Sequence, residues 1–132
     1  MPPDALAADA LTADALTADA LTDLRDAMRR FAAERDWDRF HTPKNLAMAL
    51  SGEAGELIEH FQWLTAEESA SLPAPVREEV ALEMADVLLY LVRLGDVLGI
   101  DLAEAARRKI AINAQRYPVE RVRGRAVKYD RL

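Results

Sequence analysis

Four acidic residues form two pairs with the same spacing, in two separate stretches of the chain. Glu53 and Glu56 are three residues apart, and so are Glu83 and Asp86. Residues three apart are neighbours on a helix surface, so on helices each pair would face one side. If the two helices pack antiparallel, the four carboxylates converge, and without a cation their repulsion and loss of water would raise their pKa values. Oxygen donors of this kind favour Mg²⁺, with Mn²⁺ as an alternative, over zinc or copper.

The spacing has a second interpretation, because acidic residues are common on solvated helix faces. That interpretation suits the other glutamates of these stretches, which are Glu59, Glu67, Glu68, Glu78 and Glu79. Glu53 and Glu83 differ from them because each interrupts an apolar stripe, where an unpartnered charge costs several kcal/mol. Spacing alone leaves both interpretations open.

Aromatic and cationic side chains elsewhere in the chain would suit a nucleoside polyphosphate. Aromatic rings can stack on a base, lysine can neutralise phosphates, and asparagine can bind base edges. The residues concerned are Trp37, His41, Lys44, Trp63, Tyr90, Lys109, Asn113 and Arg116. Taken singly, each one is better explained by a role in packing or as an ordinary solvated charge.

Two helices are expected before residue 65. Leu24, Met28 and Phe31 form the apolar edge of a first helix that should end near residues 35–37. Thr42 as N-cap and Pro43 at the first helical position predict a second helix. Its apolar stripe, interrupted by Glu53, runs through Leu46, Leu50, Leu57, Phe61 and Leu64.

Two further helices follow. A third, with a stripe from Val76 to Leu98 that is interrupted by Glu83, should stop at Gly99. Asp101 and Glu104 have the form of a capping box, which opens a fourth helix through about residue 115. No segment alternates as a strand would. The pattern predicts an all-α fold with a four-helix bundle-like core.

Composition narrows the class of protein. The 132 residues are 51% hydrophobic, contain no cysteine and carry a net charge of −6. One core is the expectation, without disulfides or thiolate metal sites. No apolar run is long enough for a bilayer, so a cytoplasmic location without a membrane partner is expected. Nine of the 17 basic residues lie within residues 107–131, yet with little aromatic interleaving no nucleic-acid partner is expected.

The N-terminal segment is a five-residue repeat. Residues 4–23 read DALAA, DALTA, DALTA, DALTD, with leucine at every fifth position. Successive leucines are turned by about 140° on a helix and form no continuous stripe. We interpret residues 1–22 as a low-complexity extension.

Three stretches carry a resemblance to a known family. The segments "FAAERDWDRFHTPKNLAMALSGEAGELIEHFQW", "EEVALEMADVLLYLV" and "KIAINAQRYP" resemble the all-α nucleoside triphosphate pyrophosphohydrolases of the MazG superfamily, most closely its dCTP pyrophosphatase branch. The resemblance implies a MazG-like domain over residues 23–117, followed by a basic tail over residues 118–132. It also implies a homodimer or homotetramer of helical bundles.

The family pattern implies hydrolysis of a nucleoside triphosphate to the monophosphate and pyrophosphate, with dCTP or a modified dCTP as substrate. By this resemblance Glu53, Glu56, Glu83 and Asp86 bind Mg²⁺, and Glu53 or Glu56 assists the deprotonation of water. The substrate-binding residues implied are Trp37, His41, Trp63, Tyr90, Lys109, Asn113, Arg116 and Tyr117. Met28 stands where related dCTP pyrophosphatases can have a histidine, which makes the base preference less secure than the reaction class.

Two other classes remain as alternatives. One is a carboxylate di-metal helical bundle, although its usual Glu-x-x-His motif is missing because His60 follows Glu56 by four residues. The other is a non-enzymatic helical interaction module.

Overall fold

The computed structural model describes residues 19–132, whose regular secondary structure is entirely helical, with no strand among them. The all-α prediction is confirmed. The described chain divides into two compact units, residues up to Gly99 and residues from Ile100 onward. Most of the predicted repeat extension lies outside the described residues; only its last residues enter the first helix. No helix within residues 19–132 has the length and apolarity needed to cross a membrane.

Helix α2 spans Ala20–Glu34 and ends where sequence analysis expected. After it the chain reverses at Asp36, whose φ of 54° is in the left-handed region that aspartate tolerates better than most residues. The Trp37 amide then donates to the carbonyl of Ala32, a fully buried residue. This turn and the short 3₁₀ helix η2 (Asp38–Phe40) lead directly into the next long helix.

Helix α3 spans Pro43–Glu59 and begins with the predicted cap. The Thr42 hydroxyl accepts from the Asn45 amide at 3.2 Å, and the Asn45 side chain donates to the carbonyl of Phe40 at 2.9 Å. The predicted continuation of the stripe to Leu64 as helix is wrong, because regular helix stops at Glu59. Residues 60–64 instead form successive turns with hydrogen bonds back to Leu57, Ile58 and Phe61.

Helix α5 spans Ala74–Val97 and follows a connection that holds the short helix α4 (Ala66–Ser69). Helix α4 has a reciprocal capping box between Thr65 and Glu68, at 3.1 Å in each direction. Sequence analysis had placed Glu68 among the simply solvated acids. At the other end, Gly99 has φ 67°, the left-handed conformation that terminates α5 where predicted.

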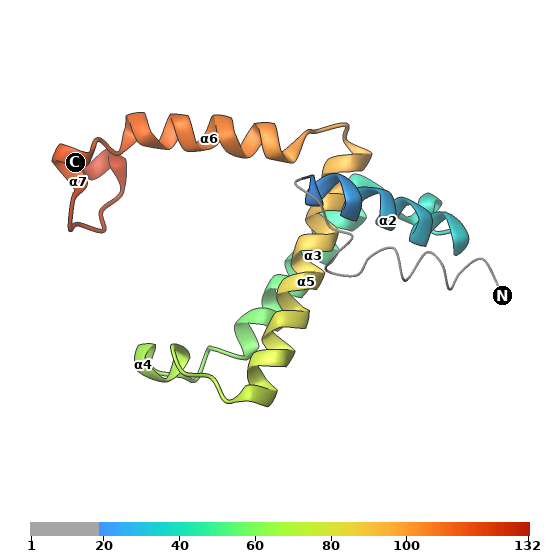
Figure 1. The fold of residues 1–132 in the computed structure, drawn as a ribbon, viewed down its shortest axis with the longest axis horizontal. Helices are drawn as coiled ribbons and strands as arrows, with labels where there is room; N and C mark the ends of the chain where they lie inside the picture. The colour runs from blue at the N-terminus through green and yellow to red at the C-terminus, as the bar shows by residue number, and fades with distance from the viewer. Residues whose placement is uncertain (1–18) are drawn as a thin grey trace. The chain divides into compact units, whose positions relative to one another are not determined.

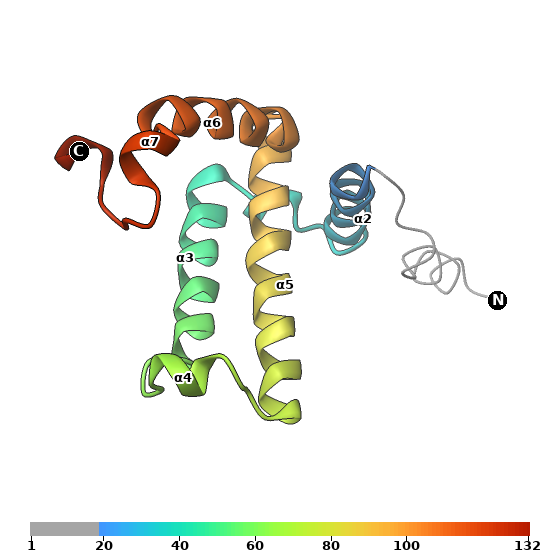
Figure 2. The same ribbon diagram turned by 60° about the vertical axis from the view of Figure 1, so that its left-hand side comes forward.

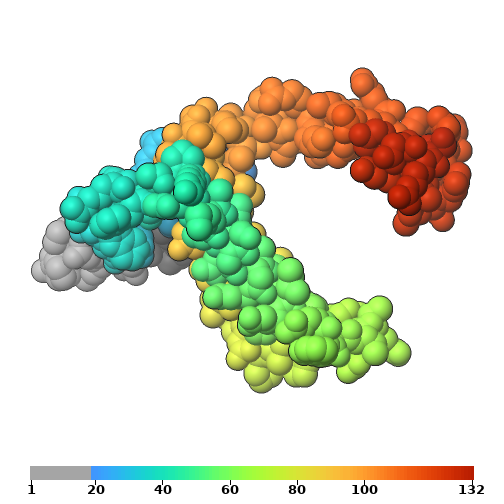
Figure 3. Space-filling model, turned by 180° about the vertical axis from the view of Figure 1, so that it is seen from behind, coloured from blue at the N-terminus to red at the C-terminus, as the bar shows by residue number. Residues whose placement is uncertain are grey.

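The first unit is organised around α5. Helices α3 and α5 lie side by side and run in opposite directions, and α2 packs against the later part of α5 (Figure 1, Figure 2). In the space-filling view the atoms of α3 lie over those of α5 along their shared length (Figure 3). The buried hydrophobic residues of this unit are Ala32, Leu46, Val80 and Val92. The antiparallel α3 and α5 pair is the arrangement that the two acidic motifs require.

The second unit contains α6 (Leu102–Arg116), α7 (Val119–Val122) and the 3₁₀ helix η3 (Tyr129–Arg131). Asp101 caps α6 by accepting from the Glu104 amide at 3.0 Å, which confirms half of the predicted capping box. The Glu104 carboxylate is paired with Arg108 at 3.5 Å. Residues 118–132, predicted as a basic tail, thus include two short helices.

Candidate metal centre

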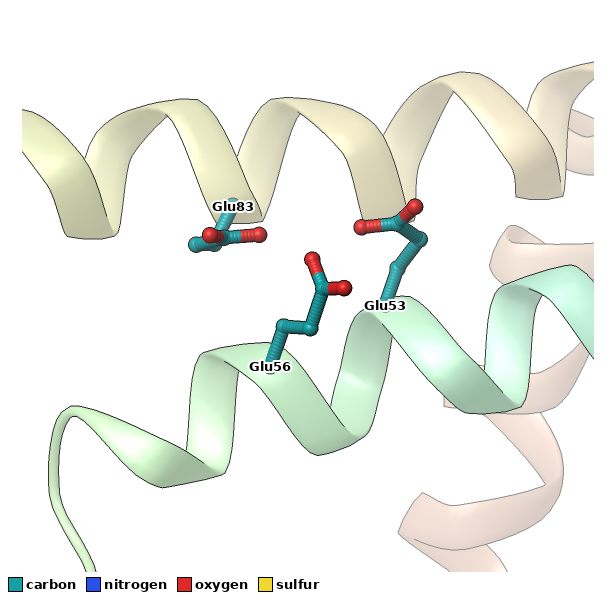
Figure 4. Close-up of side chains that lie close together, drawn as sticks. All are labelled: Glu53, Glu56 and Glu83. Atoms are coloured by element: carbon teal, nitrogen blue, oxygen red, sulfur yellow. The ribbon is translucent and has the colours of Figure 1, made fainter.

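Three of the four predicted acids converge between α3 and α5. Glu53 and Glu56 extend from successive turns of α3, and Glu83 extends from α5 toward them (Figure 4). One oxygen from each of the three carboxylates lies within 4.8 Å of the others. The three-residue spacing on α3 and the antiparallel α5 therefore produce the juxtaposition expected from the sequence.

Two oxygens of this cluster are buried without a partner. Within residues 19–132, Glu53 Oε2 and Glu83 Oε2 lack both solvent access and a hydrogen bond. Glu53 is half-buried, whereas Glu56 is exposed. Buried carboxylate oxygens are normally satisfied, so these two require a donor, a proton or a cation.

The surroundings of the cluster favour protonation of its buried members. Burial raises the pKa of Glu53 above 4.5, and interaction with the carboxyl group of Glu56 and the charges of Asp86 and Glu83 raise it further. Burial likewise raises the pKa of Glu83, followed by the effects of Glu56 and Asp86. A cation would reverse this balance by stabilising the charged form of both groups.

Asp86 has a different position from the other three acids. It lies on α5, three residues after Glu83, and its side chain is exposed. Its charge raises the pKa of both Glu53 and Glu83, so it faces the same region. It is not among the three residues whose oxygens converge within 4.8 Å. Its role as a fourth ligand stays a prediction.

His60 is a neighbour of the cluster that sequence analysis did not assign to the site. Its Nε2 lies 3.9 Å from Glu83 Oε1, and its Nδ1 lies 3.9 Å from Glu79 Oε2. His60 has the weakest influence on Glu83, whose pKa it lowers. The sequence did contain a signal for this position: His60 follows Glu56 by four residues, a spacing that places the two side chains on the same side of a helix.

The donor set fits a hard divalent cation. Carboxylate oxygens with no sulfur ligand suit Mg²⁺ or Mn²⁺, and the two unpartnered buried oxygens provide sites that a cation would satisfy. Glu53, Glu56 and Glu83 are the residues that would hold it.

The predicted aromatic residues of the first unit differ in their surroundings. Trp37 and His41 lie together, with ring centroids 6.3 Å apart, and Phe31 packs edge-on against Trp37 at 5.7 Å. Tyr90 is half-buried on α5. Trp63 is 87% exposed in the turns after α3, which is unusual for so large an apolar side chain.

The other predicted binding residues belong to the second unit. Helix α6 places Lys109, Asn113 and Arg116 at i, i+4 and i+7, as the sequence indicated, and all three are exposed. The Arg116 guanidinium lies 4.7 Å from the ring centroid of Tyr129, and Tyr117 packs edge-on against the same ring at 6.0 Å. Their contribution to the acidic site stays a prediction.

The described residues form an all-α chain in which three carboxylates converge between antiparallel helices. Comparison with known proteins identifies the family: the sequence model of the MazG-like family matches residues 48–132. The chain belongs to the MazG-like family, which confirms the resemblance seen in the sequence.

Individual relatives agree with this assignment. The chain is 48% identical over 112 residues to "dCTP pyrophosphatase 1" of Mus musculus and 46% identical to that of Homo sapiens. Each match covers 83% of this chain and 66% of the relative, so the matched region spans slightly less than two thirds of these relatives. A solved pyrophosphatase structure from Archaeoglobus fulgidus aligns with a TM-score of 0.71 and 42% identity, covering 74% of this chain and 92% of that one.

Proposed function

We propose that this protein hydrolyses a nucleoside triphosphate, dCTP or a modified dCTP before others, to the monophosphate and pyrophosphate in a Mg²⁺-dependent reaction. The observation that carries the proposal is the convergence of Glu53, Glu56 and Glu83, two of which have buried, unpartnered oxygens. The names of the relatives, dCTP pyrophosphatase and pyrophosphatase, support this reaction class.

The charge of the site explains why a cation is required. A triphosphate and a cluster of carboxylates repel one another, so the substrate cannot approach the acids unless positive charge lies between them. Bound Mg²⁺ would supply that charge, polarise a phosphoryl oxygen and lower the pKa of a water molecule. Glu53 and Glu56 from α3 and Glu83 from α5 would hold the cation.

The remaining steps of the reaction are carried out by side chains of the protein. Glu53 or Glu56 accepts the proton of the water that attacks the α-phosphorus. The bond from the α-phosphorus to the bridging oxygen breaks, and pyrophosphate leaves with the electron pair. Lys109 and Arg116 are proposed to neutralise the charge that grows on pyrophosphate, with Tyr117 beside them. Trp37, His41, Trp63, Tyr90 and Asn113 are proposed to bind the nucleoside.

A homodimer or homotetramer is part of the proposal. The side chains of four apolar residues of α5 are between 39% and 60% exposed in the single chain, namely Leu82, Met84, Leu88 and Leu91. Met84, Leu88 and Leu91 recur at helical spacing and so share one side of α5. Exposed apolar surface of this kind favours association with another molecule. Size-exclusion chromatography with light scattering measures the mass directly. A cytoplasmic location, where nucleotide pools are found, also stays a proposal.

The function is tested by incubating the protein with each dNTP and MgCl₂ in ¹⁸O-labelled water and separating the products. We expect dNMP and pyrophosphate in equal amounts, with the label in the monophosphate. Orthophosphate as the sole inorganic product, or the label in pyrophosphate, would exclude attack at the α-phosphorus. Iron loading with oxygen-dependent absorbance changes would instead favour the di-metal alternative, and no turnover with any metal would favour the interaction module.

A further inference from the structure

Arg93 stands out on α5 as a charged residue on its buried face. It is 6% exposed and lies next to Val92, which is 3% exposed. A guanidinium removed from water is destabilising unless its donors are satisfied. Arg93 takes no part in the acidic cluster. Its burial must therefore be explained by its own hydrogen-bond partners.

The donors of Arg93 are directed to three different side chains. The Nε–H group donates to His41 Nδ1 at 3.0 Å. One terminal nitrogen donates to Asp38 Oδ1 at 2.7 Å, and the other lies 3.5 Å from Asp96 Oδ2. Asp96 is in turn held by a two-fold contact with Arg29 of α2. The guanidinium is therefore held from both sides and cannot rotate away from His41.

The hydrogen bond to His41 determines where that ring carries its hydrogen. Arginine has donors and no acceptor, so His41 Nδ1 must present a lone pair to Arg93 Nε. A neutral imidazole with Nδ1 free of hydrogen carries it on Nε2. Because Nδ1 is taken by Arg93, Nε2 is the nitrogen left to contact a ligand, and it is a donor.

The charges around His41 also oppose its protonation. Burial is the largest cause of its lowered pKa, and the positive charge of Arg93 on α5 adds to the effect. Asp38, on η2, acts in the opposite direction and is 61% exposed, so water screens it. The pKa of His41 therefore lies below its ordinary value, which favours the neutral ring.

We propose that Arg93 is a positioning residue, which fixes His41 as the neutral Nε2–H tautomer so that it offers one hydrogen-bond donor to an acceptor atom of the nucleotide. The tautomer follows from the geometry alone, whereas the contact with the nucleotide rests on the proposed function. His41 is well placed for such a role because its ring lies beside Trp37, and it immediately precedes Thr42, the cap of the helix that carries Glu53 and Glu56.

The tautomer can be tested without any substrate. The chain contains two histidines, so a ¹⁵N-histidine sample gives two imidazole patterns in long-range ¹H–¹⁵N spectra, and the spectrum of His41→Gln assigns them. We expect His41 to show the Nε2–H pattern at pH 7 to 8. A Nδ1–H pattern, or a protonated ring at pH 7, overturns the inference.

Arg93→Met is the variant that separates positioning from folding. Methionine retains much of the apolar stem, Asp96 keeps Arg29 as a partner, and Asp38 is exposed to water, so the variant is expected to fold. Once the donor and its charge are lost, His41 should show mixed tautomers, and its pKa should rise toward the ordinary value while burial still holds it below that value. Arg77→Met, an exposed arginine on the same helix, is the matched control and should leave the His41 pattern unchanged.

Kinetics test the contact with the nucleotide. For Arg93→Met we expect KM to rise about tenfold and to depend more strongly on pH on the acidic side than in the unmodified protein, with kcat within about twofold. Arg93→Lys, which keeps a donor and the charge, should recover part of the loss. An unchanged KM and pH profile in Arg93→Met overturns the role of Arg93.

The two proposals fail in different ways. If nucleotides are hydrolysed but His41 has the wrong tautomer, this inference falls and the proposed function stands. If His41 has the expected tautomer but no nucleotide is turned over, the proposed function falls together with the nucleotide contact, while the Arg93–His41 hydrogen bond is upheld.

Discussion

Helix α5 carries two clusters of charged residues with opposite organisation. Around Glu83 the converging groups are carboxylates, which carry the same charge, and two of their buried oxygens have no partner within the described chain. About 15 Å further along the helix, at roughly 1.5 Å per residue, Arg93 and Asp96 are paired with each other and with Arg29 and Asp38. The second cluster contains its own counter-charges, whereas the cationic group described near the first is His60 in its protonated form, 3.9 Å from Glu83. The difference separates charges that stabilise the fold from charges arranged to bind a ligand.

The pKa directions follow the same division. Burial and neighbouring acids raise the pKa of Glu53 and Glu83, so each binds a proton more readily in the folded chain than in the unfolded one. The hydrogen bond from Arg29, opposed by burial and aided by the charges of Arg29 and Arg93, lowers the pKa of Asp96. In the absence of metal, the first pair costs stability as pH rises above 4.5, whereas Asp96 loses its stabilising effect as pH falls below 3.8.

The largest expected effect comes from breaking the acidic cluster. Glu53→Gln should lower kcat about 10²- to 10³-fold, because it removes a charged oxygen where charge must be held in the transition state. Without metal its thermal midpoint should be unchanged or higher, since repulsion among the acids is relieved. Initial rates and thermal melts measure the two effects.

A matched control lies on the same helix. Glu59 is exposed near the end of α3, and Glu59→Gln should leave both the rate and the thermal midpoint unchanged. Full activity in Glu53→Gln would remove this residue from the proposed metal centre.

Breaking the other cluster of α5, the paired cluster of Arg29, Asp38, Arg93 and Asp96, should instead affect stability. Asp96→Asn is expected to lower the free energy of unfolding by about 3 kcal/mol, because Asp96 is only 8% exposed and is the shared counter-charge of Arg29 and Arg93. Urea denaturation followed by circular dichroism measures the change. Glu104→Gln, which breaks an exposed pair with Arg108, should cost less than about 0.5 kcal/mol. Equal effects in the two variants would mean that burial does not distinguish the pairs.

The two clusters also differ in how much of them the sequence could predict. The acidic motifs rest on local spacing, because Glu53 and Glu83 each interrupt an apolar stripe and Glu56 follows Glu53 at a three-residue interval, which on a helix gives one face. The Thr42 cap and the Gly99 stop are local signals as well, and both are confirmed.

The paired cluster could not be predicted in this way. His41 and Arg93 are 52 residues apart, and Arg29 and Asp96 are 67 apart, so their contacts depend on the packing of α2 and η2 against α5. Arg93 did carry a signal, since a charge at the end of an apolar run calls for a partner, but no local pattern identifies that partner. The early end of α3 has a similar cause: apolar spacing continues through Phe61 while the backbone turns toward α4.

Magnesium should stabilise the chain through the acidic cluster alone. At 100 times its dissociation constant, Mg²⁺ should add about 2.7 kcal/mol to the free energy of unfolding at pH 8. The gain should be smaller at pH 5, because Glu53 and Glu83 have raised pKa values and must release their protons to bind the ion. Thermal melts across pH with and without MgCl₂ measure this, with Glu53→Gln as the insensitive control. The same gain at both pH values would contradict a site that contains these two carboxylates.

The smallest expected effect concerns the start of α3, which lies between the two clusters in sequence. Thr42→Ala removes the hydroxyl that accepts from the Asn45 amide and should cost about 1 kcal/mol of stability. Thr65→Ala removes a comparable cap from α4, but that helix has only four residues and can open locally, so its effect on global unfolding should be smaller. Amide hydrogen exchange distinguishes the two variants, because only Thr42→Ala should increase exchange in the first turns of α3.

A double variant tests whether the cap and the paired cluster act together. Since Thr42 follows His41 directly, the increase in hydrogen exchange should be larger in a Thr42→Ala, Arg93→Met double variant than the sum of the increases in the single variants. Additive changes would show that the cap and the paired cluster hold the start of α3 independently.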